Sequence, residues 1–462
     1  MPGHPPCRRG KPPRSASSPP SRPTTATTAT AGAPSQRTST ASSPSDGDIE
    51  YCSAPAGHDD PDIVYRVQRR LGGTAAAQRD WHQTIVLFLV SNGFSTFGSD
   101  ACLLRKAATI RGVTQTVLLG ISSDHISATY SHDGADSLFA SVNSLLLARA
   151  DISDIGYFTD MPDIEFETST PGQITLHQKD FILSLAETYP GYKSATGPTT
   201  SPACSDIIQH SLLALDPHSP HLDDLDEAAA AEYNALVNSL AHCATSTRPD
   251  IAYAVGMLCR NLDRPCALLL DDAYRVLAYL VRHSDLGLTY VCSDEPLSGM
   301  SDSDWAVRRS TTGWVFTYGM AAISWGSTIQ DSISLSSCEA EIMAASCAAG
   351  EAIHLDDLMK ELHLSDGSPI SVGVDNKAAR DLAYNPEHHD KTKHNPRRHF
   401  WVRELVENHR ITVPYVHTLL NMADFFTKPL MGGTFTSMRD RIMNVGSRVH
   451  PDTRNGGVSQ PH

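Results

Sequence analysis

Apolar and polar positions follow two different periods in the last third of the chain. Between residues 287 and 329, short runs such as TTGWVFTYG and AAISWGS alternate with a period of two, which predicts antiparallel strands; we extend the last one into SISLSS. Residues 338–363 have helical spacing and predict one long helix with an apolar face formed by Ile342, Ala345, Ala349, Ala352, Leu355 and Met359.

Shorter elements complete this region. Strands are expected at 369–374 and 411–416, and helices at 376–383 and 400–408. The order of strands, helix, strand, helices and strand predicts a mixed sheet flanked by helices, an α/β arrangement in a chain that is α+β overall.

The preceding part of the chain mixes both periods. Residues 227–282 are predicted to be helical, with a turn and a new helix start at Arg248-Pro249-Asp250. Further upstream we expect helices at 79–92, 138–150 and 179–187, and strands at 101–106, 115–120, 174–176 and within ISSDHISATY.

Composition divides the chain into segments. Residues 1–47 consist largely of Pro, Ser, Thr and Ala and cannot bury enough apolar surface to offset the entropy of ordering, so we expect disorder. The remaining segments are a globular part at 48–191, a linker at 192–227, a helical region at 228–290, a globular domain at 291–444 and a second disordered tail at 445–462.

Charge and cysteine content narrow the class of protein. The formal net charge of −15 argues against a general attraction to nucleic acid, so such binding would need a local basic patch. The ten cysteines form no CxxC pair and indicate reduced thiols of an intracellular protein, in either cytoplasm or nucleus. The apolar run at 84–90 is too short to span a bilayer, and we expect no membrane association.

Four carboxylates lie where a predicted strand ends or a predicted helix begins: Asp302, Glu341, Asp375 and Asp424. Side chains at such positions can converge, and converging carboxylates need cations because they repel one another. Hard oxygen ligands favour Mg²⁺ or Mn²⁺.

Each acid also has a simpler interpretation. Asp304 faces the same side of its strand as Asp302 and competes with it. Glu341 would otherwise be an exposed helix residue, Asp375 a helix cap, and Asp424 an acid that complements a helix dipole.

Two histidine-containing segments are further candidates. His417 lies at the end of the last strand, where a proton shuttle or an ordinary strand-end residue would fit. Residues 388–398 hold histidines, lysines and arginines whose spacing matches no common zinc motif, which favours phosphate contact or a solvated loop.

Several of these motifs occur in a familiar order. The runs SDSDWA, RRSTTGWVF, ISWGS, LSSCEAEIMA, VDNKAA, TKHNPRRHFWVREL and ADFFTKPL resemble the ribonuclease H domain of copia-type retrotransposon Pol polyproteins. Upstream, VYRVQRRLGG, RDWHQ and GFSTFGSDACLLRK resemble the family's reverse-transcriptase palm, and RPDIAYAVGMLCR resembles its connecting region. The resemblance runs from about residue 48 to residue 444.

The resemblance implies a ribonuclease-H-like domain that cleaves RNA in RNA–DNA hybrids. The family's four catalytic acids fall on Asp302, Glu341, Asp375 and Asp424, which would hold two Mg²⁺ or Mn²⁺ ions. The implied partner is an RNA–DNA hybrid or another nucleic acid, alongside other products of such a polyprotein, with contacts expected at Lys393, His394 and Arg398.

The same resemblance implies a truncated, degenerate copy. The family's Tyr-x-Asp-Asp hairpin aligns with Ile121 to Asp124, so Ser123 replaces the first metal-binding aspartate and Asp124 keeps the second. The third palm aspartate would fall before Asp48, within the Pro/Ser/Thr-rich segment. We therefore expect no polymerase activity.

Two other classes stay open. A catalytically inactive, domesticated protein could bind nucleic acid without cleaving it, as the lost palm acids and the acidic charge suggest. A transposase or integrase-type nuclease fits less well because ADFFTKPL and RPDIAYAV resemble the Pol family.

Overall fold

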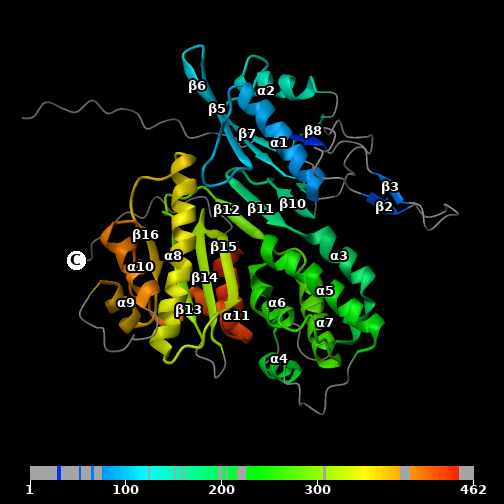
Figure 1. Ribbon diagram of the computed structural model, residues 1–462, viewed down its shortest axis with the longest axis vertical. Helices are drawn as coiled ribbons and strands as arrows, with labels where there is room; N and C mark the ends of the chain where they lie inside the picture. The colour runs from blue at the N-terminus through cyan, green and yellow to red at the C-terminus, as the bar shows by residue number, and fades with distance from the viewer. Residues whose placement is uncertain are drawn as a thin grey trace, which may run out of the picture. The chain divides into compact units, whose positions relative to one another are not determined.

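A computed structural model of the chain is shown in Figure 1. It describes residues 29–32, 51–53, 64–66, 75–122, 125–149, 152–157, 160–161, 163–195, 200–203, 206–215, 225–304, 309–384 and 396–446. The chain divides into two compact units, Met1–Phe158 and Thr159–His462.

The first unit is built on a six-stranded sheet with two helices. The strand order is β4-β5-β6-β7-β1-β8, in which β5 to β7 form an antiparallel meander. The elements are β1 (Ala29–Gly32), α1 (Ala75–Ser91), β4 (Ser95–Thr96), β5 (Leu103–Ile110), β6 (Val113–Ile121), β7 (Ile126–Tyr130), α2 (Leu138–Leu147) and β8 (Ser153–Tyr157), with a separate pair β2 (Tyr51–Ser53) and β3 (Val64–Arg66). The predicted strands and helices of this region are present.

Strand β1 lies inside the segment for which we expected disorder. It pairs antiparallel with β7 and with β8. Backbone hydrogen bonds made by a short strand do not depend on large apolar side chains, so composition did not reveal it.

The second unit begins with a small antiparallel sheet of order β12-β11-β10-β9. Its strands are β9 (Asp160–Met161), β10 (Ile164–Glu167), β11 (Gln173–His177) and β12 (Leu288–Val291). Strand β11 therefore pairs with β12, which is more than a hundred residues further along the chain.

A helical layer connects β11 to β12. It contains α3 (Lys179–Thr188), η1 (Pro190–Ser194), α4 (Ile207–Leu215), α5 (Glu227–Ser246), η2 (Pro249–Ile251), α6 (Ala252–Cys259) and α7 (Ala267–Arg282). Helix α4 lies within the predicted linker, where Ile207 and Ala214 are buried in the main core. The new start at Pro249 is observed, and Pro249 occupies the first position of η2.

The C-terminal sheet has the order β15-β14-β13-β16-β17. Strands β13, β14 and β15 are antiparallel, whereas β16 runs parallel to β13 and β17 parallel to β16. The elements are β13 (Ser298–Ser303), β14 (Thr311–Tyr318), β15 (Ala321–Ile329), α8 (Ser337–Glu361), β16 (Ile370–Gly373), α9 (Lys377–Tyr384), α10 (Pro396–Glu407), β17 (Ile411–Thr412), η4 (Thr418–Leu420), η5 (Met422–Phe426) and α11 (Gly432–Met443). The predicted mixed sheet flanked by helices is confirmed.

One strand prediction was wrong. The run SISLSS forms no strand, and Ser336 instead caps α8 by accepting a hydrogen bond from the Glu339 backbone N–H. Ile333 and Leu335 produce the alternating pattern but are largely exposed, so the pattern here does not report burial.

Helices cover both faces of this sheet. Helix α8 lies along one face in Figure 1, where Trp314 and Phe316 of β14 pack against its alanine-rich side. Val315, which points the other way, joins a larger core formed with α5, α6, α7 and α11. Among the described residues, no helix is both long and apolar enough to cross a membrane.

Candidate metal centre

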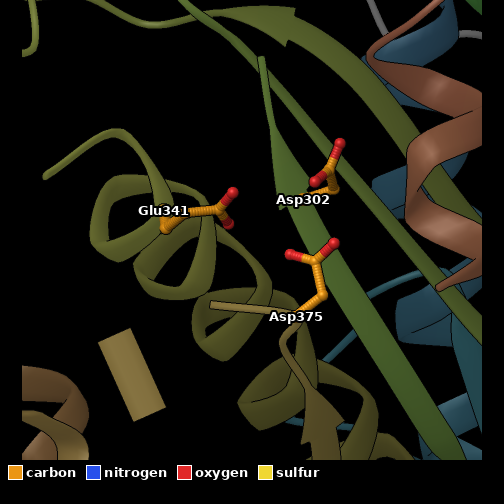
Figure 2. A group of neighbouring side chains, drawn as sticks. All are labelled: Asp302, Glu341 and Asp375. Atoms are coloured by element: carbon orange, nitrogen blue, oxygen red, sulfur yellow. The ribbon is translucent and has the colours of Figure 1, made fainter. Parts of the chain in front are cut away.

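Three of the four predicted acids meet at one end of the C-terminal sheet. Figure 2 shows Asp302 on β13, Glu341 on α8 and Asp375 after β16, with their carboxylates turned toward one another. One carboxylate oxygen from each lies within 4.8 Å of the other two. The convergence follows from strand order, because β13 is central and β16 runs parallel beside it.

The local structure explains each placement. Asp302 is the penultimate residue of β13, and Glu341 lies in the second turn of α8, which packs on β13. Asp375 lies two residues after β16, but it does not cap α9; Asn376 does, by accepting from the Ala379 backbone N–H at 3.1 Å. Its carboxylate is therefore left for other contacts.

The electrostatics of this group favour a cation. Glu341 is only 6% exposed, and its Oε2 has no hydrogen-bond partner within the described part of the chain. Burial, followed by the charges of Asp302 and Asp375, raises the pKa of Glu341 to about 9. Burial and the charge of Asp424 also raise the pKa of Asp302. Bound positive charge would reverse both effects.

The fourth acid, Asp424, approaches Asp302 from another side. It lies in η5, is buried, and receives a hydrogen bond from Lys428 Nζ at 2.9 Å. The same ammonium lies 3.3 Å from Asp302 Oδ2, which also accepts a hydrogen bond from the Thr427 hydroxyl. Asp424 is therefore linked to the group of three through Lys428.

The competing residues have local roles. Asp304 accepts hydrogen bonds from the backbone N–H and hydroxyl of Thr311, and so ties the end of β13 to β14. His417 is exposed, and its Nδ1 accepts from the Leu419 backbone N–H at 3.3 Å, capping η4. Neither belongs to the acidic group.

Comparison with curated proteins shows what the chain is similar to. It is 28% identical over 407 residues to the retrovirus-related Pol polyprotein from transposon TNT 1-94 of Nicotiana tabacum, covering 86% of this chain and 30% of that protein. It is also 28% identical to the Pol polyprotein from transposon RE1 of Arabidopsis thaliana, over 86% of this chain and 26% of that protein. The chain is thus similar over most of its length to retrovirus-related Pol polyproteins of transposons. The predicted resemblance is confirmed, and the chain spans about a quarter to a third of the length of these relatives.

Other comparisons add less. A shorter match, 38% identical to secreted RxLR effector protein 161 of Plasmopara viticola, covers 27% of this chain and 90% of that protein. The foamy viral protease-reverse transcriptase, solved with an RNA/DNA hybrid, aligns with 88% of this chain and 45% of its own at 12% identity. Its TM-score of 0.42 is too low to inform the site. No family model matches the chain.

Several predicted site residues fall outside the described residues. They are Ser123 and Asp124 of the palm hairpin, and Lys393 and His394 of the basic loop. Arg398 lies in the first turn of α10, at a position where the backbone alone is described. The roles assigned to these five residues stay predictions.

Sequence reasoning missed Thr427 and Lys428, which contact the acids directly. One signal was available: Lys428 follows Asp424 by four residues, the spacing at which side chains on one helical turn interact. The contact of Lys428 with Asp302, which lies 126 residues earlier in the chain, could not be predicted from the local sequence pattern.

Proposed function

We propose that the C-terminal part of this chain hydrolyses the RNA strand of RNA–DNA hybrids, with Asp302, Glu341 and Asp375 holding a divalent cation. The observation that carries the proposal is the convergence of three carboxylates from β13, α8 and the end of β16 within 4.8 Å. The similarity of the chain to Pol polyproteins of transposons supports the choice of nucleic acid as substrate.

The donor set suits Mg²⁺ or Mn²⁺. All three side chains offer hard carboxylate oxygens, and Glu341 keeps a buried oxygen with no hydrogen-bond partner in the described regions. An orphaned buried acceptor is costly unless something positive pairs with it. A divalent ion held there would lower the pKa of a bound water and polarise the scissile phosphate.

The protein itself positions and restrains this site. Asp302 is held by the Thr427 hydroxyl and the Lys428 ammonium, so its carboxylate has little freedom to rotate. Glu341 is fixed by the burial of α8 against the sheet. Selection of RNA over DNA would come from contact with the ribose 2′-hydroxyl, which DNA lacks.

The test is cleavage of a labelled RNA–DNA hybrid in Mg²⁺ and in Mn²⁺. We expect the full chain to cut the RNA strand and Asp302→Asn to lose at least about 100-fold in rate, the scale of losses from removing a key electrostatic group. Asp366→Asn is the matched control: Asp366 is an exposed acid in the loop before β16 and makes only local contacts. An intact hybrid with the wild-type chain, or equal rates for the wild type and Asp302→Asn, would refute the proposal.

A second candidate is binding of nucleic acid without cleavage. It is favoured by Ser123 at the first position of the expected palm acid pair, a feature expected of a chain that has lost a catalytic function. In the same assay this function predicts retention of the hybrid on a native gel with no product and no effect of Asp302→Asn. For either candidate we expect no primer extension by the full chain.

A further inference from the structure

One side-chain cation of the protein contacts both Asp302 and Asp424. Lys428 Nζ lies 2.9 Å from Asp424 Oδ1 and 3.3 Å from Asp302 Oδ2. We propose that Lys428 takes the place of a second metal ion, so that the centre binds one divalent ion through Asp302, Glu341 and Asp375. This inference rests on the proposed function and replaces the two ions expected from the sequence.

Asp302 has two sets of neighbours that differ in charge. Glu341 and Asp375 supply carboxylate oxygens close to it, and among the described side chains no cation hydrogen-bonds or ion-pairs with either of them. Asp424 and Lys428 lie at its Oδ2 atom, where the ammonium and the Thr427 hydroxyl both donate. A metal ion bridging Asp302 and Asp424 would have to displace the ammonium from both carboxylates.

The backbone holds Lys428 in this position. Its N–H donates to Asp424 O at 3.2 Å, and the preceding turn is buried through Phe425 and Phe426. The Ser327 hydroxyl anchors the same turn by donating to Phe426 O at 2.6 Å. The ammonium is therefore tethered beside the two acids at a high effective concentration.

Gly313 shows how closely this turn fits the sheet. It pairs with Asp302 in the register of β13 and β14, and an added Cβ would lie 2.8 Å from Ala423 O and 2.9 Å from Phe426 Cβ. The absence of a side chain at Gly313 thus lets η5 lie directly against β14 beside Asp302. This close fit fixes the turn from which Lys428 extends.

The Lys428 ammonium lies within ion-pair distance of both acids at once. An ammonium has three donors, and two of them face Asp302 and Asp424. Because the side chain is 39% exposed, the third can reach a phosphate oxygen of a bound strand.

The test counts Mn²⁺ ions bound to the full chain, from the electron paramagnetic resonance signal of free Mn²⁺. The number of ions in this centre is the number lost in Asp302→Asn, because Asp302 would be a ligand of the proposed ion and also of a second ion if one were bound. We expect a loss of one ion per chain relative to the wild type. A loss of two ions, together with hybrid cleavage, would overturn this inference and leave the proposed function standing.

Substitution of Lys428 provides the decisive comparison. In Lys428→Met we expect one additional Mn²⁺ per chain, bound where the ammonium lay, whereas Lys428→Arg should keep the wild-type count. Lys360→Met is the matched control, since Lys360 also pairs at four-residue spacing with a buried acid, Asp356, at 2.6 Å. An unchanged number of bound Mn²⁺ ions in Lys428→Met would refute the proposal that this lysine takes the place of a second metal ion.

A second variant covers the case in which Lys428→Met fails to fold. Asp424→Asn should keep the single ion, because in this proposal Asp424 contacts the lysine and is not a ligand of the ion. A centre with two ions would lose one of them in this variant. If Asp302→Asn binds as many ions as the wild type, and the wild type leaves the hybrid intact, the proposed function itself is refuted. The failures of the two proposals are thus distinct.

Discussion

At the scale of single residues, the candidate centre places charge where charge is unfavourable. Glu341 is buried, lies beside two other carboxylates, and has a pKa raised to about 9 by burial and by their charges. Without a bound cation, its ionisation opposes folding. The same residue therefore weakens the metal-free fold and strengthens metal binding, as is common at functional sites.

This conflict gives a pH-dependent prediction. In the unfolded chain Glu341 ionises near its ordinary value of 4.5, whereas in the fold it stays protonated up to about 9. Its contribution to stability is therefore full below about pH 4.5 and is lost as the pH rises towards 9. In EDTA at pH 8 we expect Glu341→Gln to melt above the wild type by at least about 2–4 °C, the effect of roughly 1 kcal/mol.

The comparison at low pH and with metal completes the test. At pH 5 the melting temperatures of the two proteins should lie closer together than at pH 8, because most of the range between the unfolded and folded pKa of Glu341 lies above pH 5. Saturating Mg²⁺ should raise the melting temperature of the wild type more than that of Glu341→Gln. A gap between the metal-free proteins that is the same at pH 5 and pH 8 would contradict the pKa argument.

At the scale of elements, close contact between backbones brings the functional groups together. Gly313 lets η5 lie against β14, and the alanine-rich face of α8 lets that helix lie close to the sheet. Small residues therefore set the distances between the elements that carry Asp302, Glu341 and Asp424. Larger residues at these contacts would separate the elements even if every acid were kept.

Two glycine substitutions should have opposite effects. Gly313→Ala places a Cβ 2.8 Å from Ala423 O, a backbone atom that cannot move without displacing η5, so we expect a loss of about 1–3 kcal/mol. Gly350→Ala in α8 places a Cβ 3.6 Å from Trp401, an ordinary contact, and should gain about 0.5–1 kcal/mol because glycine weakens a helix interior. Urea unfolding midpoints of both variants measure the difference, and a stabilised Gly313→Ala would refute the fit of η5.

At the scale of the whole molecule, the second unit shares one core between its helical layer and its C-terminal sheet. Val315 and Phe426 belong to the same buried cluster as Leu236, Leu277 and Leu280 of α5 and α7. The Trp325 indole N–H donates to Ala244 O of α5 at 2.8 Å. The buried Arg248–Asp250 ion pair also lies in this layer, where the Tyr279 hydroxyl donates to Asp250.

Shared burial predicts which segments fold. Residues 291–444 expressed alone would expose one apolar face of their sheet, and we expect aggregation or a broad, non-cooperative thermal transition. Residues 159–462 keep the helical layer and should melt cooperatively as a monodisperse species. Circular dichroism melts and size-exclusion chromatography of the two segments decide this, and a cooperative, soluble 291–444 segment would show that the sheet does not depend on the helices.

Local patterns predicted a large part of this fold. The period of two in TTGWVFTYG and the helical spacing of Ile342, Ala345 and Ala349 report burial on one side of an element, and burial on one side imposes those periods. Where alternation was not tied to burial, as at Ile333 and Leu335, the prediction was wrong. Strand β1 was missed because its backbone pairing leaves no trace in hydrophobicity.

The acids themselves could be recognised along the chain, since Asp302, Glu341, Asp375 and Asp424 each lie in an ordered motif. Their grouping could not be recognised in the sequence, because it depends on the order of β13 and β16 and on the fit of η5 over Gly313. Those contacts join residues more than a hundred positions apart, and a pattern that reports local burial carries no information about which distant surfaces meet. The pairing of Lys428 with both Asp302 and Asp424 arises from the folded arrangement for the same reason.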